Sequence, residues 1–168
     1  MSLIQKQLKI VGLDPSLRNW GIAIGSAPLD TGIMTIDDLR TVQTEPQPQG
    51  GKVRAGPWDI QSAYTLFDGV FEVVKDADIV CIEVPTGSRD AKAALGRGIC
   101  LGIIGSLYSN KLIFVTPQSV KKIIGSPSAT KAESVDLAVR RHPEAPWPIY
   151  RGKVSVGKAE HAADAIHA

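Results

Sequence analysis

The sequence predicts an α/β fold, in which a mixed five-stranded sheet carries helices on both faces. Three strand-like segments come first along the chain, and after them segments with helical spacing alternate with short apolar runs. Leading strands joined by short turns form antiparallel hairpins, whereas strand–helix–strand units place their strands parallel. At 168 residues the chain can bury a full hydrophobic core, so we expect one domain over residues 1–168.

The strand assignments follow from apolar, β-branched runs that end at turn residues. The first two runs form a hairpin, and Asp37 and Asp38 interrupt the third strand. The run that begins at Ile79 is continuously apolar, which is typical of a central parallel strand covered on both faces. The predicted strands are residues 8–14, 20–25, a stretch within 32–43, 79–84 and 112–115.

Helices are expected where apolar residues recur at steps of three and four, or where capping residues open a segment. Thr130 and Glu133 have the spacing of a capping box. Four glycines after Ala91 would let one helix pack closely but weaken it. Residues 46–57 lack an apolar period and predict an exposed loop. The predicted helices are about 58–75, 91–109, 117–124, 131–141 and 157–168.

Composition predicts a soluble, cytoplasmic protein. Hydrophobic residues make up 43% of the chain, and no apolar run approaches the ~20 residues that cross a bilayer. Cys81 and Cys100 lie in apolar runs, so we expect reduced core thiols. Residues 1–84 carry a net charge of −4 and residues 85–168 one of +6. A basic half suits a surface that meets phosphates, although a solvated basic face gives the same pattern.

Two carboxylates stand at the ends of predicted strands. Asp14 closes the first strand, and Glu83 comes at the end of the strand that follows the first long helix. These two strands are natural neighbours in a sheet of this topology, so both carboxylates would project from one sheet edge, where α/β proteins build their sites. Mg²⁺ is held by one or two carboxylates together with phosphate oxygens and water. The pair therefore predicts a divalent-metal site, although strand-end carboxylates are also common as solvated caps.

A second pair of functional side chains lies in the C-terminal segment. His161 and Asp164 are three residues apart in a predicted helix, so they share one helical face about one turn apart. The small alanines around them would let that face approach the sheet edge. A histidine with an aspartate one turn on can supply a metal ligand, a general base, or both. A helix-end histidine and aspartate that simply face solvent would give the same pattern.

Several segments of the chain, in order and at sensible spacing, combine into one family pattern. They are Ile10–Pro15 with Trp20–Ala23, Ile82–Glu83, Leu95–Gly98, Thr116–Gly125 with Ala129–Lys131, and His161–Ala165. Together they resemble the RuvC-type Holliday-junction resolvases, whose fold is RNase H-like. The resemblance runs through most of the chain, and a viral or otherwise divergent member would fit it.

The resemblance implies a metal-dependent endonuclease that nicks four-way DNA junctions symmetrically as a homodimer, with two Mg²⁺ or Mn²⁺ ions per active site. Asp14 would bridge both ions, and Glu83 and Asp164 would each complete one site. His161 would bind the metal or orient the attacking water. The glycine-rich segment is similar to the family's dimer-interface helix. The residues predicted to bind DNA are Lys121, Lys122, Lys131 and Arg89.

Departures from the family pattern keep other functions open. Ser16 stands where many members have glycine, and residues 84–89 lack the aromatic side chain that bacterial members insert at the junction centre. One alternative is another RNase H-like nuclease that acts on RNA or on flap or branched DNA. Another is a nucleic-acid-binding module without catalysis. The turn at Asp14–Ser16 also resembles the phosphate-binding turn of actin-like ATPases, but Ser16 replaces its glycine.

Overall fold

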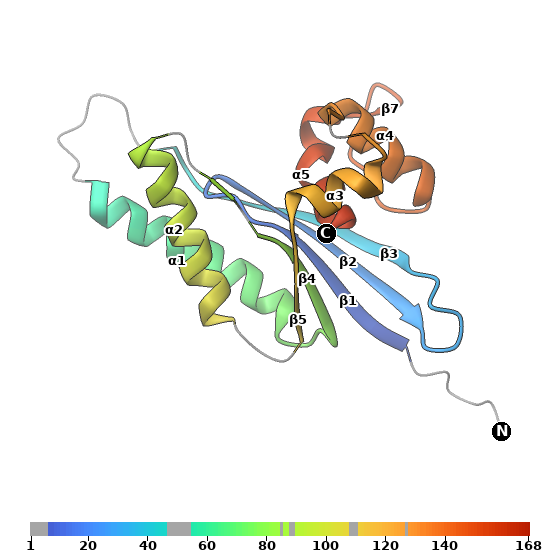
Figure 1. Ribbon diagram of the computed structural model, residues 1–168, viewed down its shortest axis with the longest axis horizontal. Helices are drawn as coiled ribbons and strands as arrows, with labels where there is room; N and C mark the ends of the chain where they lie inside the picture. The colour runs from blue at the N-terminus through green and yellow to red at the C-terminus, as the bar shows by residue number, and fades with distance from the viewer. Residues whose placement is uncertain (1–6, 47–54, 85, 88–89, 108–110, 127) are drawn as a thin grey trace.

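A mixed five-stranded sheet forms the centre of the protein (Figure 1). A computed structural model describes residues 7–46, 55–84, 86–87, 90–107, 111–126 and 128–168. The strand order is β3-β2-β1-β4-β5; the first three strands pair antiparallel, whereas β1, β4 and β5 run parallel. The predicted sheet is confirmed. The strands are β1 (Gln7–Asp14), β2 (Asn19–Pro28), β3 (Thr35–Gln43), β4 (Ile79–Glu83) and β5 (Leu112–Val115).

The third strand continues through its two acidic residues because it lies at the edge of the sheet. Ile24 of β2 pairs with Asp38 and Gly25 pairs with Ile36, so the register skips Asp37. A bulge of this kind leaves one residue unpaired and turns it toward solvent. Asp37 is exposed. The interruption expected from the sequence is therefore a bulge within a continuous strand.

The helices lie close to their expected positions, with one correction. Helix α1 begins at Ala55, so residues 55–57 are helical and not part of the predicted loop; proline is tolerated in a first helical turn because its missing N–H has no partner there. Residues 47–54 of that loop lie outside the described residues. The helices are α1 (Ala55–Val74), α2 (Ala91–Ser106), α3 (Pro117–Ile124), α4 (Lys131–Arg141) and α5 (Val156–His167).

Helix ends carry the caps that the sequence indicates. Thr130 and Glu133 form the predicted capping box at the start of α4, and the side chain of Thr116 caps α3. Helix α3 ends at Gly125, whose φ of 87° requires the left-handed region that glycine adopts freely. A two-stranded hairpin, β6 (Ile149–Tyr150) with β7 (Lys153–Val154), connects α4 to α5 and was not predicted.

Helices cover both faces of the sheet, as expected (Figure 1). Helices α1 and α2 pack on one face, where Leu13, Trp20 and Leu66 belong to the larger buried core. Helix α5 packs on β1, β2 and β3 from the other face, with α3 and α4 beside it. Val135 and Ala163 belong to the smaller core on this side. Within the described ranges, no helix is both long and apolar enough to cross a membrane.

Candidate active site

Asp14 and Glu83 end two adjacent parallel strands. Leu13 of β1 pairs with Ile82 of β4, and the next residue of each strand is the carboxylate. Both side chains therefore belong to the same edge of the sheet, as the strand pattern predicted. Both are partly buried, so their charges act on one another through a medium less polar than water.

Helix α5 lies directly against the sheet because two strand positions are glycine. A Cβ added at Gly12 of β1 would overlap the carbonyl oxygen of Ala165, and one added at Gly21 of β2 would overlap that of His161. No other residue type fits at this spacing without moving the helix. The predicted alanines complete the contact, since Ala162 and Ala163 are buried. The helix thus brings its polar face to the end of β1.

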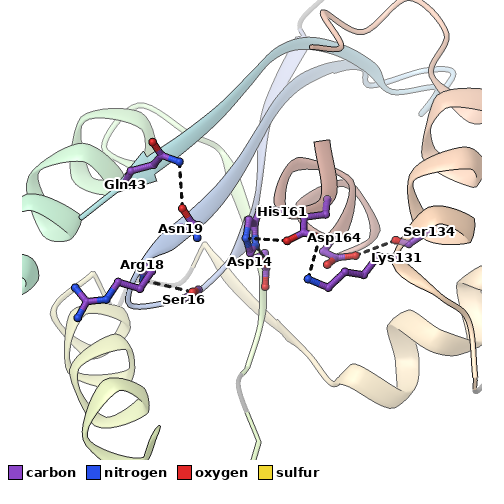
Figure 2. A network of polar contacts seen from close by, with 10 residues as sticks. Asp14, Ser16, Arg18, Asn19, Gln43, Lys131, Ser134, His161 and Asp164 are labelled. Atoms are coloured by element: carbon purple, nitrogen blue, oxygen red, sulfur yellow. Dashed lines mark hydrogen bonds and ion pairs between the residues drawn. The ribbon is translucent and has the colours of Figure 1, made fainter. Parts of the chain in front are cut away.

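His161 contacts Asp14 across this interface. Its Nδ1 atom lies 3.0 Å from Oδ2 of Asp14, and Figure 2 shows the two side chains facing each other. On its other side, Nε2 lies 3.4 Å from Oε1 of Glu160. Glu160 also forms an ion pair with Lys131, 2.8 Å from Oε2 to Nζ. The imidazole is therefore held between two carboxylates, and its hydrogen bond to Asp14 is the main cause of a raised His161 pKa.

Asp164, one turn further along α5, is held by a second helix. The hydroxyl of Ser134 on α4 donates to its Oδ1 at 2.8 Å (Figure 2). Ser134 is buried, and its carbonyl oxygen lies 3.1 Å from Nε2 of His167. Burial lowers the His167 pKa, which favours the neutral ring. Ser134 therefore joins α4 to α5 at two residues, Asp164 and His167.

Four of the predicted residues line a single cavity of about 170 Å³. Glu83 and Asp164 line it together with Lys121 and Lys131. Lys122 is exposed and lines a neighbouring cavity of about 470 Å³ with Lys121 instead. Arg89 lies outside the described residues. The two lysines that share the cavity with the carboxylates are thus the ones best placed to meet an anion bound there.

The carboxylates at this edge disfavour one another's ionisation. Burial, followed by the charges of Asp14 and Asp164, raises the pKa of Glu83 to about 7, against a small opposing effect of Lys121. Burial also raises the pKa of Asp164, against the hydrogen bond from Ser134. A cluster of buried acids that disfavour one another's ionisation is the electrostatic setting in which a cation is bound.

The donor atoms present are those that Mg²⁺ and Mn²⁺ prefer. Carboxylate oxygens come from Asp14, Glu83 and Asp164, and His161 adds an imidazole. Among the described residues, no three or more such side chains gather closely enough to hold one ion between them. A site that binds Mg²⁺ through one or two carboxylates, with phosphate and water as further ligands, requires no such group.

Sequence reasoning missed Glu160 and Ser134. Glu160 precedes His161 directly, so the helical pattern placed it off the functional face; it reaches Lys131 and His161 through its side-chain length. Ser134 follows the capping box by one residue, and nothing in the pattern distinguishes it from an ordinary buried serine. Both roles depend on how α4 packs against α5.

Comparison with known proteins finds structural neighbours. No protein-family model and no curated protein sequence matches the chain. Thermus thermophilus RuvC in complex with a Holliday junction substrate is similar in structure, with a TM-score of 0.67 and 19% identity over 95% of this chain and 89% of that one. The Fowlpox virus resolvase in complex with Holliday junction DNA is similar with a TM-score of 0.59 and 13% identity, over 95% of this chain and 92% of that one. The yeast mitochondrial Holliday junction resolvase is similar with a TM-score of 0.53 and 12% identity, over 99% of this chain and 82% of that one.

These neighbours share the mixed sheet and its helices over nearly the whole described chain. The predicted resemblance is therefore confirmed at the level of structure. The chain has the RNase H-like fold of the RuvC-type Holliday-junction resolvases.

Proposed function

We propose that the protein is a metal-dependent endonuclease that nicks four-way DNA junctions. The observation that carries this proposal is the meeting of Asp14, Glu83, His161 and Asp164 at one sheet edge, from β1, β4 and α5. The shared fold supports it, because two of the similar structures were solved with Holliday junction DNA. Lys121 and Lys131 beside the carboxylates are in place to bind the phosphate.

Two Mg²⁺ or Mn²⁺ ions fit the donor set. Asp14, Glu83 and Asp164 would hold the ions through their carboxylate oxygens, and His161 would stand beside them. Bound divalent ions would supply Lewis-acid stabilisation of the charge that develops on the scissile phosphate. Deprotonated ligands are needed for this binding, so the raised pKa of Glu83 links metal affinity to pH.

The chain's own residues supply orientation and proton transfer. Asp14 fixes the ring of His161 through Nδ1, which leaves Nε2 on the side of Glu160. A histidine oriented by a carboxylate can accept a proton from an attacking water. Lys131, drawn toward the site by Glu160, can exchange that carboxylate for a DNA phosphate. Ser134 keeps Asp164 turned toward the cavity.

Cleavage of a synthetic four-way junction by Asp14→Asn tests the proposal. We expect this variant to bind the junction as the wild type does and to lose Mg²⁺- and Mn²⁺-dependent nicking. Asp68→Asn, on the exposed side of α1, is the matched control and should cut normally. Nicking by Asp14→Asn at the wild-type rate would overturn the assignment of the site.

The substrate class is tested separately. The wild type is offered four-way junctions, flaps, linear duplex and RNA–DNA hybrids of matched length. Faster nicking of four-way junctions, at paired positions, is the expected result. Preference for hybrids or flaps would favour another RNase H-like nuclease. Binding without any cleavage in Mn²⁺ would favour a nucleic-acid-binding module.

We also propose that the protein acts as a homodimer through α2. Leu95 and Leu101 on this helix are 53% and 36% exposed. At Gly98 and Gly102 a Cβ would meet nothing within 4 Å, so this face is open to a second helix. Sedimentation analysis should show a dimer for the wild type and a monomer for Leu101→Glu. A wild-type monomer at micromolar concentration would contradict the proposal.

A further inference from the structure

A groove of about 450 Å³ lies beside the candidate active site, between the turn after β1 and the first turns of α2. It begins at Pro15, the residue that follows Asp14, and Arg97 and Cys100 of α2 line its opposite wall. Of the predicted DNA-binding residues that the structure describes, Lys121, Lys122 and Lys131, none belongs to it.

The groove is built by a close approach of helix and turn. A Cβ at Gly96 would lie 3.2 Å from Cδ2 of Leu17, so the glycine lets α2 pack tightly at the floor. Asp90 begins the helix as its N-cap, and its Oδ1 accepts a hydrogen bond from the backbone N–H of Ala93 at 2.8 Å. The one carboxylate of the groove is therefore engaged in capping the helix.

Three cationic side chains line the groove. Arg18 is held in place, since its Nη1 donates to Oγ1 of Thr44 at 3.1 Å and to the carbonyl oxygen of Glu45 at 2.9 Å. Its guanidinium also stacks 4.0 Å from the ring centroid of Trp58. Lys92 is exposed and Arg97 half-buried. Among the described residues, none of the three cations forms an ion pair with a carboxylate.

The cations of the groove and the lysines of the catalytic cavity lie on different sides of Asp14. Figure 2 shows Arg18 on one side of Asp14 and Lys131 on the other. Lys92 and Arg97 line the groove with Arg18, whereas Lys121 shares the cavity of Lys131. A strand with its reacting phosphate at Asp14 therefore meets positive charge in both directions.

We infer that this groove binds the phosphate backbone of the cleaved DNA strand, on the side of the reacting phosphate away from Lys131. The inference rests on the proposed function, because it takes the reacting phosphate to lie at Asp14. Cations that are not paired with a carboxylate provide sequence-independent phosphate contacts. Lys121 and Lys131 then hold one flank of the strand, and Lys92 and Arg97 hold the other.

The test is junction binding by the double variant Lys92→Ala/Arg97→Ala. Fluorescence anisotropy with a labelled four-way junction, in Ca²⁺ to prevent cleavage, gives the affinity as a function of salt. Each lost phosphate contact lowers the salt-dependence slope by about 1, so we expect a fall of about 2. Lys153→Ala, an exposed cation on the β6–β7 hairpin, is the control and should leave the slope unchanged. A Lys92→Gln/Arg97→Gln pair covers the case in which the alanine variant folds poorly.

Methylphosphonate linkages, which carry no charge, show which phosphates of the DNA the groove contacts. Methylphosphonates placed on the groove flank of the cleaved phosphate should weaken binding by the wild type but not binding by the double variant. On the flank assigned to Lys131, methylphosphonates should weaken binding by the wild type and by the double variant equally. Binding by Lys131→Ala should be weakened by methylphosphonates on the groove flank but not on its own flank. The inference is wrong if the double variant keeps the wild-type affinity and salt-dependence slope. It is also wrong if the double variant is equally sensitive to methylphosphonates on both flanks. If the groove inference fails but the wild type still cuts junctions, the proposed function stands. If the wild type neither binds nor cuts DNA, the groove inference and the proposed function are both wrong.

Discussion

Nδ1 of His161 lies 3.0 Å from Oδ2 of Asp14, although 147 residues separate them in the chain. This contact orients the imidazole at the end of β1. Removing the ring with His161→Ala should lower the junction-cleavage rate by about 10²–10⁴-fold, the usual contribution of a positioned acid or base. Single-turnover kinetics measure the effect. Junction affinity in Ca²⁺ should not change, and a cleavage rate within a few-fold of wild type would contradict the role.

Ser134→Ala removes the hydroxyl that donates to Asp164 at 2.8 Å. Loss of such an orienting hydrogen bond commonly costs about 10–100-fold in metal affinity or activity. We expect the Mn²⁺ concentration for half-maximal nicking to rise in this range. Ser62→Ala, at a buried serine of α1, is the matched control. An equal effect of both substitutions would show general destabilisation in place of a positioning role.

Glu83 makes the stability of the metal-free protein depend on pH. Its pKa is raised from 4.5 to about 7, so the protonated form is favoured by folding. Its contribution to stability is complete below the unfolded value of 4.5 and is lost as the pH rises through about 7. Glu83→Gln should therefore raise the Tm in EDTA at about pH 8 and leave it nearly unchanged at about pH 5.

A bound metal ion should offset the loss of stability that Glu83 causes at high pH, because the ion binds the ionised carboxylate. Thermal denaturation with Mn²⁺ should raise the wild-type Tm more at about pH 8 than at about pH 6, and should raise that of Glu83→Gln less. Each kcal/mol corresponds to about 2–4 °C for a chain of this size. A Tm difference between the two proteins that does not vary with pH would contradict the raised pKa.

Gly21→Ala should move α5 away from the sheet. The added Cβ would overlap the carbonyl oxygen of His161, and overpacking of this kind costs about 1–3 kcal/mol. We expect a lower Tm and a loss of nicking larger than the stability change explains, since His161 would leave Asp14. Gly56→Ala is the control, because a Cβ there meets nothing within 4 Å. Normal nicking by Gly21→Ala would show that the helix position is not critical.

The sequence predicts the sheet and the two strand-end carboxylates well because both depend on local pattern. An apolar run such as Ile79–Glu83 has few alternatives to a central strand. The hairpin at Ile149–Val154 was missed because its strands have two residues each, too few for any alternation. The start of α1 was misplaced because Gly56 and Pro57 favour turns in isolation, yet both fit a first helical turn.

The sequence predicts Asp14 and Glu83 at one sheet edge and His161 and Asp164 on one helical face, but not the contacts between the two pairs. His161 and Asp164 share a helical face by spacing alone. Their approach to Asp14 depends on Gly12 and Gly21, whose importance appears only when the helix lies across them. The Glu160–Lys131 ion pair likewise joins two helices whose packing angle no local pattern contains.

The packing of α5 on the glycines of β1 and β2 also has a consequence during synthesis of the protein. Asp14 is made early, whereas His161 and Asp164 belong to a helix that follows every other described element. A ribosome-bound chain that has not yet released residues 156–167 holds Asp14 and Glu83 without their partners. The proposed cleavage therefore requires that α5 has docked on the sheet.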